Sequence, residues 1–583
     1  MVNLTIDGRP AQVPEGTTIL DAAASVDIEI PSLCYLKELN EISACRVCCV
    51  EVEGEGKLVP SCNNVVREGM VIRTNSPRAL EARRVNMELI LSQHDNKCAT
   101  CIRSGTCQLQ KIANDMGILG VSYPTDLARG KKADWTTTFP LYRDVNKCIK
   151  CMRCIQVCDK VQSLSVWDIS GSGARTTIDV SGNRVIKQAD CSLCGQCITH
   201  CPTGALRERD DTQKAYAALG DPDRVTIVQI APAVRAAWGE AFGMPTGKAT
   251  VGQLVSVLRK LGADYVFDTT FSADLTIMEE GTELLQRLQA GDLDNQPMFT
   301  SCCPGWVRFL KSQFPEMTGR LSTAKSPQQM FGATVKTWYA EKMGWDKKDI
   351  VVVGVMPCTA KKFEVRRDDE DAAGSGIPDV DIALTTREIA RMIDRAGIQF
   401  TELPDEEFDS PMGESTGASV IFGATGGVME AALRTAAEWV GGKPLEQVEF
   451  TDVRGTAGVK EASYQIGDLT VNVAVASGLA NAKKLLEQVK SGMKNYHFIE
   501  IMGCPGGCVN GGGQPIISAK RKMEVDIRAE RAKALYSEDA SKKYRKSHQN
   551  PSVIRIYEEF LGEPGGHKAH ELLHTTYSQK AKV

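Results

Sequence analysis

The chain contains 583 residues, of which 42% are hydrophobic and 24% are charged, and its formal net charge is −4. This length predicts three to five domains of a soluble globular protein. The small negative charge argues against nucleic acid or an anionic membrane as a partner, and no apolar run approaches the ~20 residues that span a bilayer. The N-terminus lacks the basic and apolar regions of a signal peptide, so we expect a cytoplasmic location.

Cysteine is the residue type that stands out, with 21 copies. A reducing cytoplasm does not maintain disulfides, so these side chains need another explanation. Nearly all of them fall in tight groups along the chain. This grouping favours metal or iron–sulfur cluster binding over scattered structural thiols.

Residues 1–80 predict a small β-grasp domain. Val2, Leu4 and Ile6 alternate on one face of a strand, and the turn DGRP leads into a second strand. The segment GTTILDAAASV follows as a helix, with Thr17 or Thr18 as its N-cap.

A loop with four cysteines follows this helix: Cys34, Cys45, Cys48 and Cys62. The layout resembles that of plant-type ferredoxins, in which a close Cys-x2-Cys pair and two outlying cysteines hold a 2Fe-2S cluster. The first spacing is longer than usual, so the match is to the variant fused to larger redox enzymes; zinc is the alternative here. We interpret Cys49, which points away from Cys48, as a small buried hydrophobic residue.

Residues 81–137 contain four soft ligands within the stretch HDNKCATCIRSGTC: His94, Cys98, Cys101 and Cys107. They are close enough in sequence to surround one metal centre without long loop closure. Zinc is a competitor on chemistry alone. The position between a 2Fe-2S region and a ferredoxin-like region favours a 4Fe-4S cluster, whose potential a neutral imidazole should raise.

Residues 138–210 contain the strongest local signal, an internal repeat of two Cys-x2-Cys-x2-Cys-x3-Cys cassettes. In two-cluster ferredoxins the fourth cysteine of each cassette serves the other cluster. One 4Fe-4S cluster is therefore expected on Cys148, Cys151, Cys154 and Cys201, and the second on Cys191, Cys194, Cys197 and Cys158. We interpret His200 as a packing or hydrogen-bonding residue. Four clusters upstream of one large region suggest a path for electrons.

Residues 211–519 alternate apolar runs with helical segments, as in layered α/β structure with buried strands. Two runs end directly in a cysteine, Cys358 after VVVGVMP and Cys504 after FIEIMG. Loops at the carboxyl ends of such strands are where α/β sheets bind ligands. Cys302, Cys303 and Cys508 are the other cysteines here, so only the fold can bring the five together.

Three stretches carry a family resemblance: TSCCPGW at 300–306, MPCTAKKFE at 356–364 and EIMGCPGGCVNGGGQP at 500–515. They resemble the three signatures of FeFe-hydrogenases, and the order of the upstream cluster regions resembles the long, monomeric, clostridial ferredoxin-linked form. The resemblance covers essentially the whole chain. It implies a multidomain α+β protein with a β-grasp 2Fe-2S domain, a His-and-three-Cys 4Fe-4S domain, a two-cluster ferredoxin domain and a large α/β catalytic domain.

That family carries an H-cluster, a 4Fe-4S cube joined through a cysteine sulfur to a two-iron unit with CO, cyanide and an azadithiolate. Carried over by motif, the implied cube ligands are Cys303, Cys358, Cys504 and Cys508, and Cys508 is the bridge. The resemblance implies that Cys302 stays unligated and passes protons to and from the bridging amine as a thiol. The glycines of GGCVNGGG suit a backbone that approaches a bulky ligand closely.

A proton path is implied along LTIMEEGTELLQRL, which predicts a helix. Glu280 and Glu283 share one face of it, and Arg287 lies within reach of Glu283. Composition alone describes an ordinary solvated face. The resemblance instead aligns both acids and Ser322 with the family's proton relay, in the order Cys302, a water, Glu280, Ser322, Glu283 and the surface near Arg287.

Lys361 is implied to donate to a cyanide of the two-iron unit, because a buried lysine needs a charge partner. We expect its neighbour Lys362 at the surface. The remaining pocket walls, which exclude water from reactive iron, are expected to include Pro232, Ser326, Gln328, Met356, Phe422 and Met502. Core packing explains the two methionines and Phe422 almost as well.

Residues 520–583 form a charged tail that resembles the helical small-subunit segment of the family. It contains four histidines that give the impression of a metal site: His548, His567, His570 and His574. We interpret them as surface residues.

The implied activity is that of a ferredoxin hydrogenase, 2H⁺ + 2e⁻ ⇌ H2, with ferredoxin or flavodoxin as the electron carrier and maturation enzymes to supply the two-iron unit. The segment GATGG at 423–427 lacks the strand and helix context of a nicotinamide or flavin fingerprint. The alternatives are a sensory H2-binding relative with slow turnover and a cluster-bearing assembly or scaffold protein. A sensor tends to lose Cys302 or the relay acids, and a scaffold does not need them.

Overall fold

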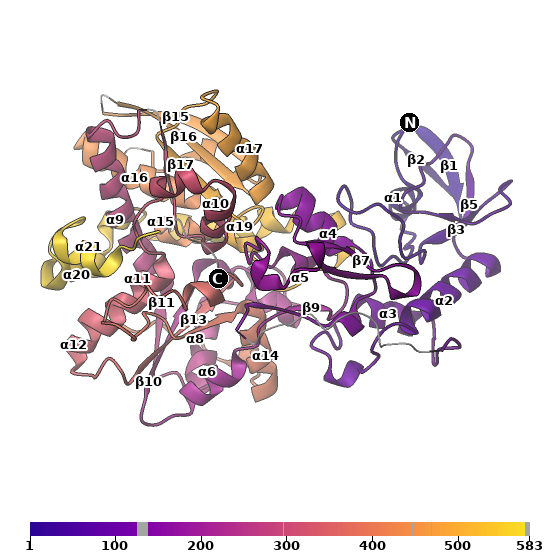
Figure 1. Cartoon of the computed structure of the whole chain (residues 1–583), viewed down its shortest axis with the longest axis horizontal. Coiled ribbons are helices and arrows are strands. Elements are labelled where there is room, and N and C mark those ends of the chain that lie inside the picture. The colour runs from indigo at the N-terminus through magenta and orange to yellow at the C-terminus, as the bar shows by residue number, and fades with distance from the viewer. Residues whose placement is uncertain (125–137, 295, 446, 468, 578–583) are drawn as a thin grey trace.

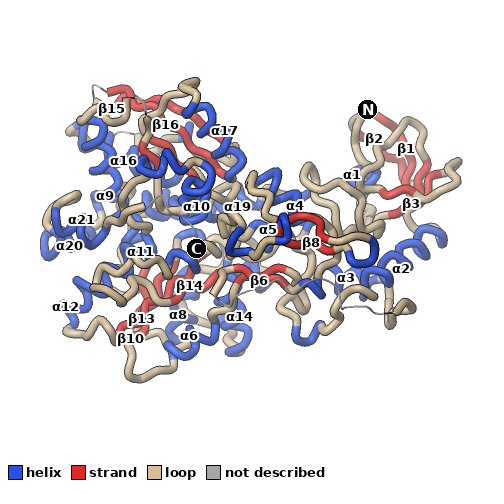
Figure 2. The backbone as a smooth tube through the Cα atoms, in the orientation of Figure 1, coloured by secondary structure: helices blue, strands red, loops and turns tan. Residues whose placement is uncertain are grey.

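The computed structural model describes residues 1–124, 138–294, 296–445, 447–467 and 469–577 of an elongated molecule (Figure 1). The small N-terminal domains form one end and the catalytic domain forms the other, larger end. The larger sheets lie at these two ends, and the part between them contains short helices, loops and short paired strands (Figure 2). The predicted regions 81–137 and 520–583 extend into residues 125–137 and 578–583, which lie outside the described residues.

The first domain is a five-stranded sheet in the order β2-β1-β5-β3-β4 with one helix packed against it. Its elements are β1 Val2–Ile6, β2 Arg9–Val13, α1 Ile19–Ala24, β3 Cys49–Val52, β4 Val59–Pro60 and β5 Val71–Arg73. The side chain of Thr18 caps α1 by accepting a hydrogen bond from the backbone N–H of Asp21 at 3.1 Å. Cys49 is buried, as the sequence predicts. A β-grasp arrangement is therefore present.

The next region is helical and leads into the ferredoxin repeat. Its elements are α2 Pro77–Leu91, α3 Gln108–Asp115, β6 Leu141–Arg143, α4 Arg153–Gln156, β7 Trp167–Ser170, β8 Thr177–Val180, α5 Gln196–His200 and β9 Leu206–Glu208. The two cassettes share the same backbone path, because equivalent residues adopt left-handed φ angles. Lys150 and Leu193 have φ of 57° and 60°, and Met152 and Gly195 have 63° and 70°. These left-handed residues give both Cys-x2-Cys-x2-Cys loops the same sequence of turns.

The catalytic domain contains two four-stranded sheets. One is parallel throughout, in the order β11-β10-β13-β14, and the other has the order β12-β17-β16-β15 with β15 antiparallel. The strands are β10 Val225–Ile230, β11 Tyr265–Asp268, β12 Met298–Phe299, β13 Ile350–Met356, β14 Ile382–Thr385, β15 Val459–Ile466, β16 Leu469–Ser477 and β17 Phe498–Met502. Strands β13 and β17 are apolar and buried along almost their whole length, as expected where helices cover both faces.

Helices surround these sheets. They are α6 Thr212–Leu219, α7 Pro232–Arg235, α8 Val251–Lys260, α9 Thr269–Gln289, α10 Pro304–Gln313, α11 Pro327–Thr334, α12 Ala340–Met343, α13 Lys361–Glu364, α14 Thr386–Ala396, α15 Gly417–Val420, α16 Gly427–Gly441 and α17 Leu479–Lys490. Helix α9 lies against both α11 and α16, so it runs between the parts of the domain that hold the two sheets. This position makes α9 the central helix of the domain.

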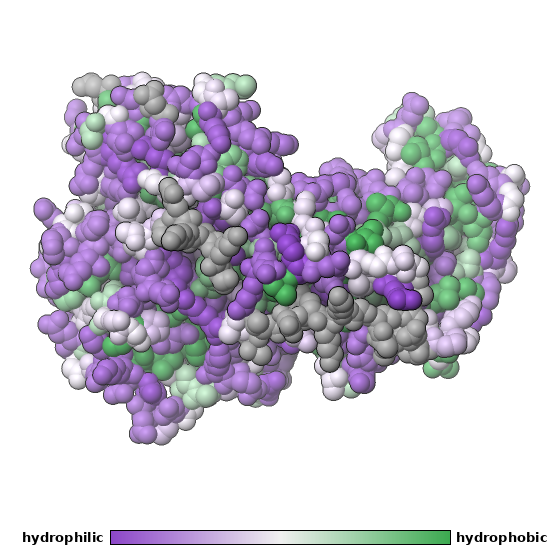
Figure 3. Space-filling model, in the orientation of Figure 1, coloured by the Kyte–Doolittle hydropathy of each residue, from purple (hydrophilic) through white to green (hydrophobic). Residues whose placement is uncertain are grey.

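The C-terminal tail consists of α18 Ala519–Glu524, α19 Ile527–Ser541, α20 Pro551–Ile556 and α21 His567–Leu573, and the last three pack on the catalytic domain. Helix α19 contacts α15, α20 contacts α9, and α21 contacts α11. The fully buried Arg434 pairs with Asp539 of α19 at 2.9 Å. The face in Figure 3 is mostly hydrophilic, with smaller hydrophobic areas over the N-terminal part. Within the described residues, every helix is too short or too polar to cross a bilayer.

Candidate active site

Loops at the ends of strands from both sheets bring four distant cysteines to one place. Strands β12 and β17 are neighbours in one sheet, and β13 belongs to the other. Cys303 caps α10 shortly after β12, Cys358 follows β13, and Cys504 and Cys508 follow β17. Because a ligand site forms where the carboxyl ends of parallel strands face outward, the topology explains why these loops meet.

The glycines of the 503–513 loop allow the loops to approach closely. The backbone N–H of Gly503 donates to Sγ of Cys303 at 3.4 Å. A Cβ atom on Gly511 would lie 2.2 Å from the carbonyl oxygen of Pro357, and one on Gly512 would lie 2.1 Å from the carbonyl oxygen of Cys194. The described contacts of these two glycines are therefore with neighbouring backbone. Any larger residue would push the cysteine loops apart.

The chemistry of this site suits an iron–sulfur cluster. Burial, together with the charge of Cys303, raises the pKa of Cys358 to about 12, and burial likewise raises the pKa of Cys504 and Cys508. Such an environment disfavours free thiolates and needs a cationic centre to neutralise them. Among the described residues, no three His, Cys, Asp or Glu side chains converge on a single metal ion. Four cysteine thiolates match the ligand set of a 4Fe-4S cluster.

Cys302 lies beside this cysteine group and joins an apolar cluster with Cys508, Phe422 and Met502. Burial raises the pKa of the Cys302 thiol well above its usual range, and the neighbouring charges of Glu280 and Cys303 add to this effect. The thiol therefore holds its proton firmly at neutral pH. The sequence predicts a group that gains and loses protons at modest cost, and the structure places it in a setting where losing the proton is costly.

A line of polar side chains runs from the interior to the surface along α9. The hydroxyl of Ser322 donates to Oε2 of Glu283 at 3.0 Å, and the guanidinium of Arg287 donates to Oε1 of Glu283 at 2.6 Å. Ser322 also lies close enough to Glu280 to lower the pKa of that carboxyl. Glu280 and Ser322 are buried, whereas the side chains of Glu283 and Arg287 are 12% and 18% exposed. The structure brings these four residues together, and the alternative of a solvated face is wrong for Glu280.

Burial makes Glu280 an unusual carboxyl. It raises the pKa to about 8, and the charge of Glu283 contributes in the same direction, whereas the hydrogen bond from Ser322 opposes it. Its Oε2 atom is buried without a hydrogen-bond partner in the protein. This unpaired carboxyl oxygen is available to accept a hydrogen bond from the bridging water that the family resemblance implies. A carboxyl with this pKa can both donate and accept protons near neutral pH.

Glu364 is a functional candidate that the sequence reasoning missed. Its Oε2 atom accepts hydrogen bonds from Lys361 at 2.7 Å, from Ser326 at 2.9 Å and from Gln328 at 3.1 Å. Lys361 also donates to the carbonyl oxygen of Cys302 at 3.1 Å. One buried carboxylate therefore holds three of the predicted pocket residues. The available signal was its position three residues after Lys361 in the same motif, which places both on one helix face.

The other predicted pocket residues are distributed around the site. Phe422 and Met502 pack with Cys302, as described above. Met356 ends β13 near Gln328, since both lie within about 3 Å of the position that a Cβ on Gly354 would take. Pro232 is buried at the start of α7, directly after β10. Phe422, Met502 and Cys302 thus belong to one apolar cluster, and the described contacts do not connect Pro232 with the cysteines.

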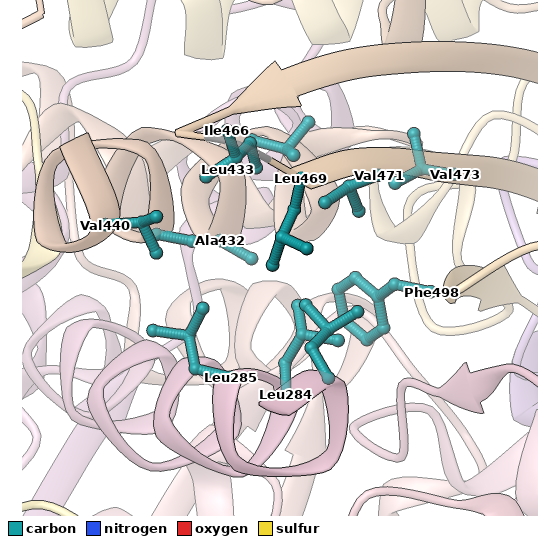
Figure 4. A pocket seen from close by; sticks show the side chains of 12 residues that line it. Leu284, Leu285, Ala432, Leu433, Val440, Ile466, Leu469, Val471, Val473 and Phe498 are labelled. Carbon is teal, nitrogen blue, oxygen red and sulfur yellow. The ribbon is translucent and has the colours of Figure 1, made fainter. Parts of the chain in front are cut away.

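Apolar packing fixes the outer half of α9. A pocket with hydrophobic side chains only lies between α9, α16 and strands β15 to β17 (Figure 4). Its lining residues are Leu284, Leu285, Leu288, Ala432, Leu433, Ala436, Val440, Ile466, Leu469, Val471, Val473 and Phe498. Leu284 follows Glu283 directly, so this packing determines which way the acidic face of α9 points.

Two surface predictions in this region are wrong. Lys362 is fully buried and pairs with Asp211 at 2.8 Å and Glu388 at 2.9 Å, because α13 turns it toward α14 instead of toward solvent. His574 is buried as well, between Glu279 and Thr323. A charged side chain is buried when partners neutralise it, and those partners are distant in sequence.

The other histidines of the tail differ from one another. His567 and His570 are exposed, as predicted. His548 is only partly exposed and lies 2.7 Å from Glu438, to which it hydrogen bonds through Nε2. The four histidines do not form one cluster, since His548 contacts α16 whereas His574 contacts α9.

The cysteines of the first and third predicted regions lie in groups. Thiols of the first domain touch one another, Cys34 with Cys45 and Cys62, and Cys62 with Cys48. In the third predicted region, one small cavity is lined by Cys148, Cys151, Cys154 and Cys201. Charges of Cys194, Cys191 and Cys158 act together on Cys197. The fourth cysteine of each cassette therefore lies with the other cassette.

His94 has the environment of a ligand rather than of a surface residue. It is 6% exposed, and its Nδ1 atom is buried without a hydrogen-bond partner. Burial lowers its pKa, so the imidazole is neutral, as a metal ligand must be. His200 instead hydrogen bonds through Nδ1 to the carbonyl oxygen of Gln196 at 2.8 Å, in agreement with the prediction of a hydrogen-bonding role.

Contacts between the cysteine loops define a branched path. Asn40 donates to the carbonyl oxygens of Cys34 and Cys151, at 2.7 and 2.9 Å. Gly204, three residues after Cys201, lies close to a cysteine of the 81–137 region, because a Cβ atom at this glycine would lie 2.8 Å from Sγ of Cys101. Both outer groups therefore adjoin the cluster region of Cys148, Cys151, Cys154 and Cys201.

The inner cassette meets the catalytic site directly. Sγ of Cys504 lies 3.9 Å from the carbonyl oxygen of Cys194, and the hydroxyl of Thr359 donates to the carbonyl oxygen of Leu193 at 2.6 Å. The two outer groups, in the first domain and in the 81–137 region, thus both adjoin the group of Cys148, Cys151, Cys154 and Cys201. The second group of the ferredoxin repeat adjoins the cysteine loops of the candidate active site. Spacing in the sequence alone predicts a path and does not reveal the branch.

Family models match the chain in the same order as these regions. They are a 2Fe-2S iron-sulfur cluster binding domain at residues 1–77, an NADH-ubiquinone oxidoreductase-G iron-sulfur binding region at 83–121 and a 4Fe-4S dicluster domain at 147–205. The C-terminal domain of the iron only hydrogenase large subunit matches residues 224–512, and the iron hydrogenase small subunit matches 525–580. The chain belongs to the FeFe-hydrogenase family and carries accessory iron–sulfur domains.

Individual relatives cover the whole chain or its catalytic part. The chain is 49% identical to NADP-reducing hydrogenase subunit HndD of Solidesulfovibrio fructosivorans, over 100% of both chains. It is 41% identical to iron hydrogenase 1 of Clostridium pasteurianum, over 99% of this chain and 100% of the relative. A structure of a variant of FeFe-hydrogenase HydA1 from Chlamydomonas reinhardtii matches with a TM-score of 0.57 and 44% identity, over 64% of this chain and 99% of that chain.

Proposed function

We propose that the chain catalyses 2H⁺ + 2e⁻ ⇌ H2 at an H-cluster in the catalytic domain. Cys303, Cys358, Cys504 and Cys508 would hold the 4Fe-4S cube, with Cys508 as the bridge to the two-iron unit. When bound, this group supplies iron sites at which protons and electrons combine. The observation that carries the proposal is the meeting of four distant cysteine loops beside Cys302, whose thiol keeps its proton.

Proton transfer is assigned to Cys302, Glu280, Ser322, Glu283 and Arg287, which we call the relay. Cys302 exchanges a proton with Glu280 through one water. Glu280, with its pKa of about 8, passes the proton through the Ser322 hydroxyl to Glu283. Arg287 holds Glu283 at the partly exposed end, where the proton reaches solvent. Each transfer then occurs between groups within hydrogen-bond reach or through one water.

Lys361 is assigned to the recognition of an anionic ligand of the two-iron unit. An ammonium group has three N–H donors. Two of them are engaged by Glu364 and by the carbonyl oxygen of Cys302, so one remains for the bound group. Glu364 keeps the lysine charged, because its nearby carboxylate raises the pKa of Lys361. Met502 and Phe422 exclude water from the same side.

Four accessory clusters, one 2Fe-2S and three 4Fe-4S, are assigned to electron transfer, with ferredoxin or flavodoxin as the carrier. Support for a one-electron carrier comes from the cysteine groups at the N-terminal end and from the likeness to iron hydrogenase 1. The likeness to a subunit of an NADP-reducing hydrogenase favours a second candidate. In that case, partner subunits would connect these clusters to NADP.

Iron content and infrared spectra test the catalytic assignment. Protein matured with the dedicated enzymes should contain roughly 20 iron atoms per chain and show bands of metal-bound CO and cyanide. Protein made without those enzymes should lack two of the iron atoms, show no such bands and be inactive. Zinc in the site, or full loading without hydrogen turnover, would contradict the proposal.

A comparison of electron donors tests the partner. If ferredoxin is the carrier, the isolated chain should evolve hydrogen from reduced ferredoxin and show no activity with NADPH. If the chain is a subunit of an NADP-linked complex, NADPH-driven activity should appear only after the partner subunits are added. Activity with NADPH in the isolated chain would contradict both candidates.

A further inference from the structure

The C-terminal tail encloses one buried carboxylate on the same helix as the relay acids. Glu279, the neighbour of Glu280 on α9, is fully buried. It accepts hydrogen bonds from three groups of the tail: the hydroxyl of Tyr557, the backbone N–H of Gly565 at 3.0 Å and Nε2 of His574 at 2.8 Å. A buried carboxylate requires such donors, so this residue anchors the tail to α9.

His574 connects this carboxylate to the segment that carries Ser322. Its Nδ1 atom lies 2.8 Å from the hydroxyl oxygen of Thr323. A carboxylate can only accept, so Nε2 donates to Glu279, and Nδ1 forms the second hydrogen bond of the ring with the Thr323 hydroxyl. One ring therefore joins α9 to the residue next to Ser322. The side chain of His574 is 4% exposed, which excludes water as a substitute partner.

Backbone pairing strengthens the same connection. The N–H of Lys325 donates to the carbonyl oxygen of Leu573, and the N–H of Thr575 donates to the carbonyl oxygen of Thr323, both at 2.8 Å. Ala324 and His574 form an antiparallel bridge. The tail thus adds a short strand to the 322–325 segment, and His574 is the residue of that strand that reaches α9.

The 322–325 segment in turn holds the outer relay acid. The backbone N–H of Thr323 donates to Oε2 of Glu283 at 2.9 Å, and the Ser322 hydroxyl donates to the same oxygen at 3.0 Å. A shift of Thr323 would therefore move both donors to this oxygen together. Proton transfer depends steeply on such distances, because a misplacement of about 1 Å can cost on the order of 10²-fold in rate.

We propose that His574 and Glu279 are positioning residues for proton transfer, and that the small-subunit-like tail is a working part of the relay. They hold the 322–325 segment so that Ser322 stays within reach of both Glu280 and Glu283. This inference rests on the proposed function, because it requires that protons pass through Ser322. It assigns to the tail a role in turnover in addition to its role in packing.

The experiment compares three substitutions in the matured full-length enzyme. His574→Ala removes the imidazole and with it the hydrogen bonds to both Glu279 and Thr323. Thr323→Val removes the hydroxyl partner and leaves the backbone N–H that bonds to Glu283. His567→Ala, at the exposed start of the helix α21 that precedes His574, is the control. Hydrogen turnover in H2O and D2O, iron content, infrared bands and hydrogen–deuterium exchange of the 320–326 peptide are measured for each.

We expect His574→Ala and Thr323→Val each to lower turnover roughly tenfold at unchanged iron content and infrared bands. The solvent isotope effect should increase, because proton transfer becomes more rate-limiting, and amide exchange at 320–326 should rise. The double variant should be no slower than His574→Ala, since both changes break one link. His567→Ala should behave as the wild type.

Two results would overturn the inference. One is a Thr323→Val enzyme whose turnover, isotope effect and amide exchange equal those of the wild type. The other is a loss of activity that only follows a loss of iron, with an unchanged isotope effect. Failure of the proposed function itself is distinguishable, because the fully loaded wild type would then produce no hydrogen, whereas the exchange measurement would still report whether His574 holds the segment.

Discussion

Two regions of this molecule are built in different ways. One is the set of accessory cysteine groups, here called the electron side, and the other is the relay with the residues that hold it, here called the proton side. On the electron side, most ligands of each group come from one short stretch of sequence, and the contacts between groups use backbone carbonyls, as between Asn40 and Cys151. On the proton side, side chains from α9, the 322–325 segment and the tail meet across more than 250 positions of sequence. Cluster ligation tolerates variation outside the cassette, whereas proton transfer depends on the packing of separate elements.

The sharpest test of this contrast is the replacement of Cys302, which adjoins both sides. Cys302→Ser should lower hydrogen turnover by roughly 10³-fold with any electron donor, since a hydroxyl is a far weaker acid than a thiol. Iron content and infrared bands should stay at wild-type values. Cys49→Ser, a buried thiol in the first domain, is the matched control and should retain turnover. Wild-type activity in the Cys302 variant would remove this residue from the relay.

The next largest effect is expected from the inner relay acid. Glu280→Gln keeps the shape of the side chain and removes its ability to carry a proton, so turnover should fall about 10²-fold. In the wild type, activity should change across a pH near 8, the pKa to which burial raises Glu280. The variant should lose that inflection. A pH profile that keeps the same inflection in the variant would assign the titration to another group.

A comparison of two accessory sites tests the branch on the electron side. His94→Ala should affect one outer branch, so ferredoxin-driven turnover should fall only in part. Cys151→Ser affects the junction, so the same activity should fall much further. Methyl viologen, which can reduce the protein elsewhere, serves as the control donor, and iron analysis checks which clusters remain. Equal losses in the two variants would indicate a linear path.

The smallest expected effect concerns stability. The folded protein raises the pKa of Glu280 from about 4.5 to about 8, so folding favours its neutral form. This contribution is fully present below pH 4.5 and is lost as the pH rises toward 8. The melting temperature of Glu280→Gln relative to the wild type should therefore increase between pH 5 and 8, by the equivalent of roughly 3 to 4 kcal/mol. A constant difference across that range would show that Glu280 does not titrate there.

Much of the molecule was predictable from the sequence. The cassettes of residues 148–158 and 191–201, the strand-and-helix start of the first domain and the three signature stretches are local patterns, so their spacing reveals them. Thr18 was recognisable as a cap because its hydrogen bond spans three residues. Lys362 and His574 were misjudged because their partners are distant in sequence: Asp211 precedes Lys362 by 151 positions, and Glu279 precedes His574 by 295.

The amino-acid sequence by itself determined the family, the number of ligand groups and the candidate ligands, because a metal site needs particular side chains at short spacings. The tertiary structure decided which side chains are buried together. It alone raised the pKa of Glu280, gathered three donors on Glu364 and made the tail adjoin the relay. The physical reason is that desolvation and hydrogen-bond geometry depend on what packs around a group, and distant elements supply that packing.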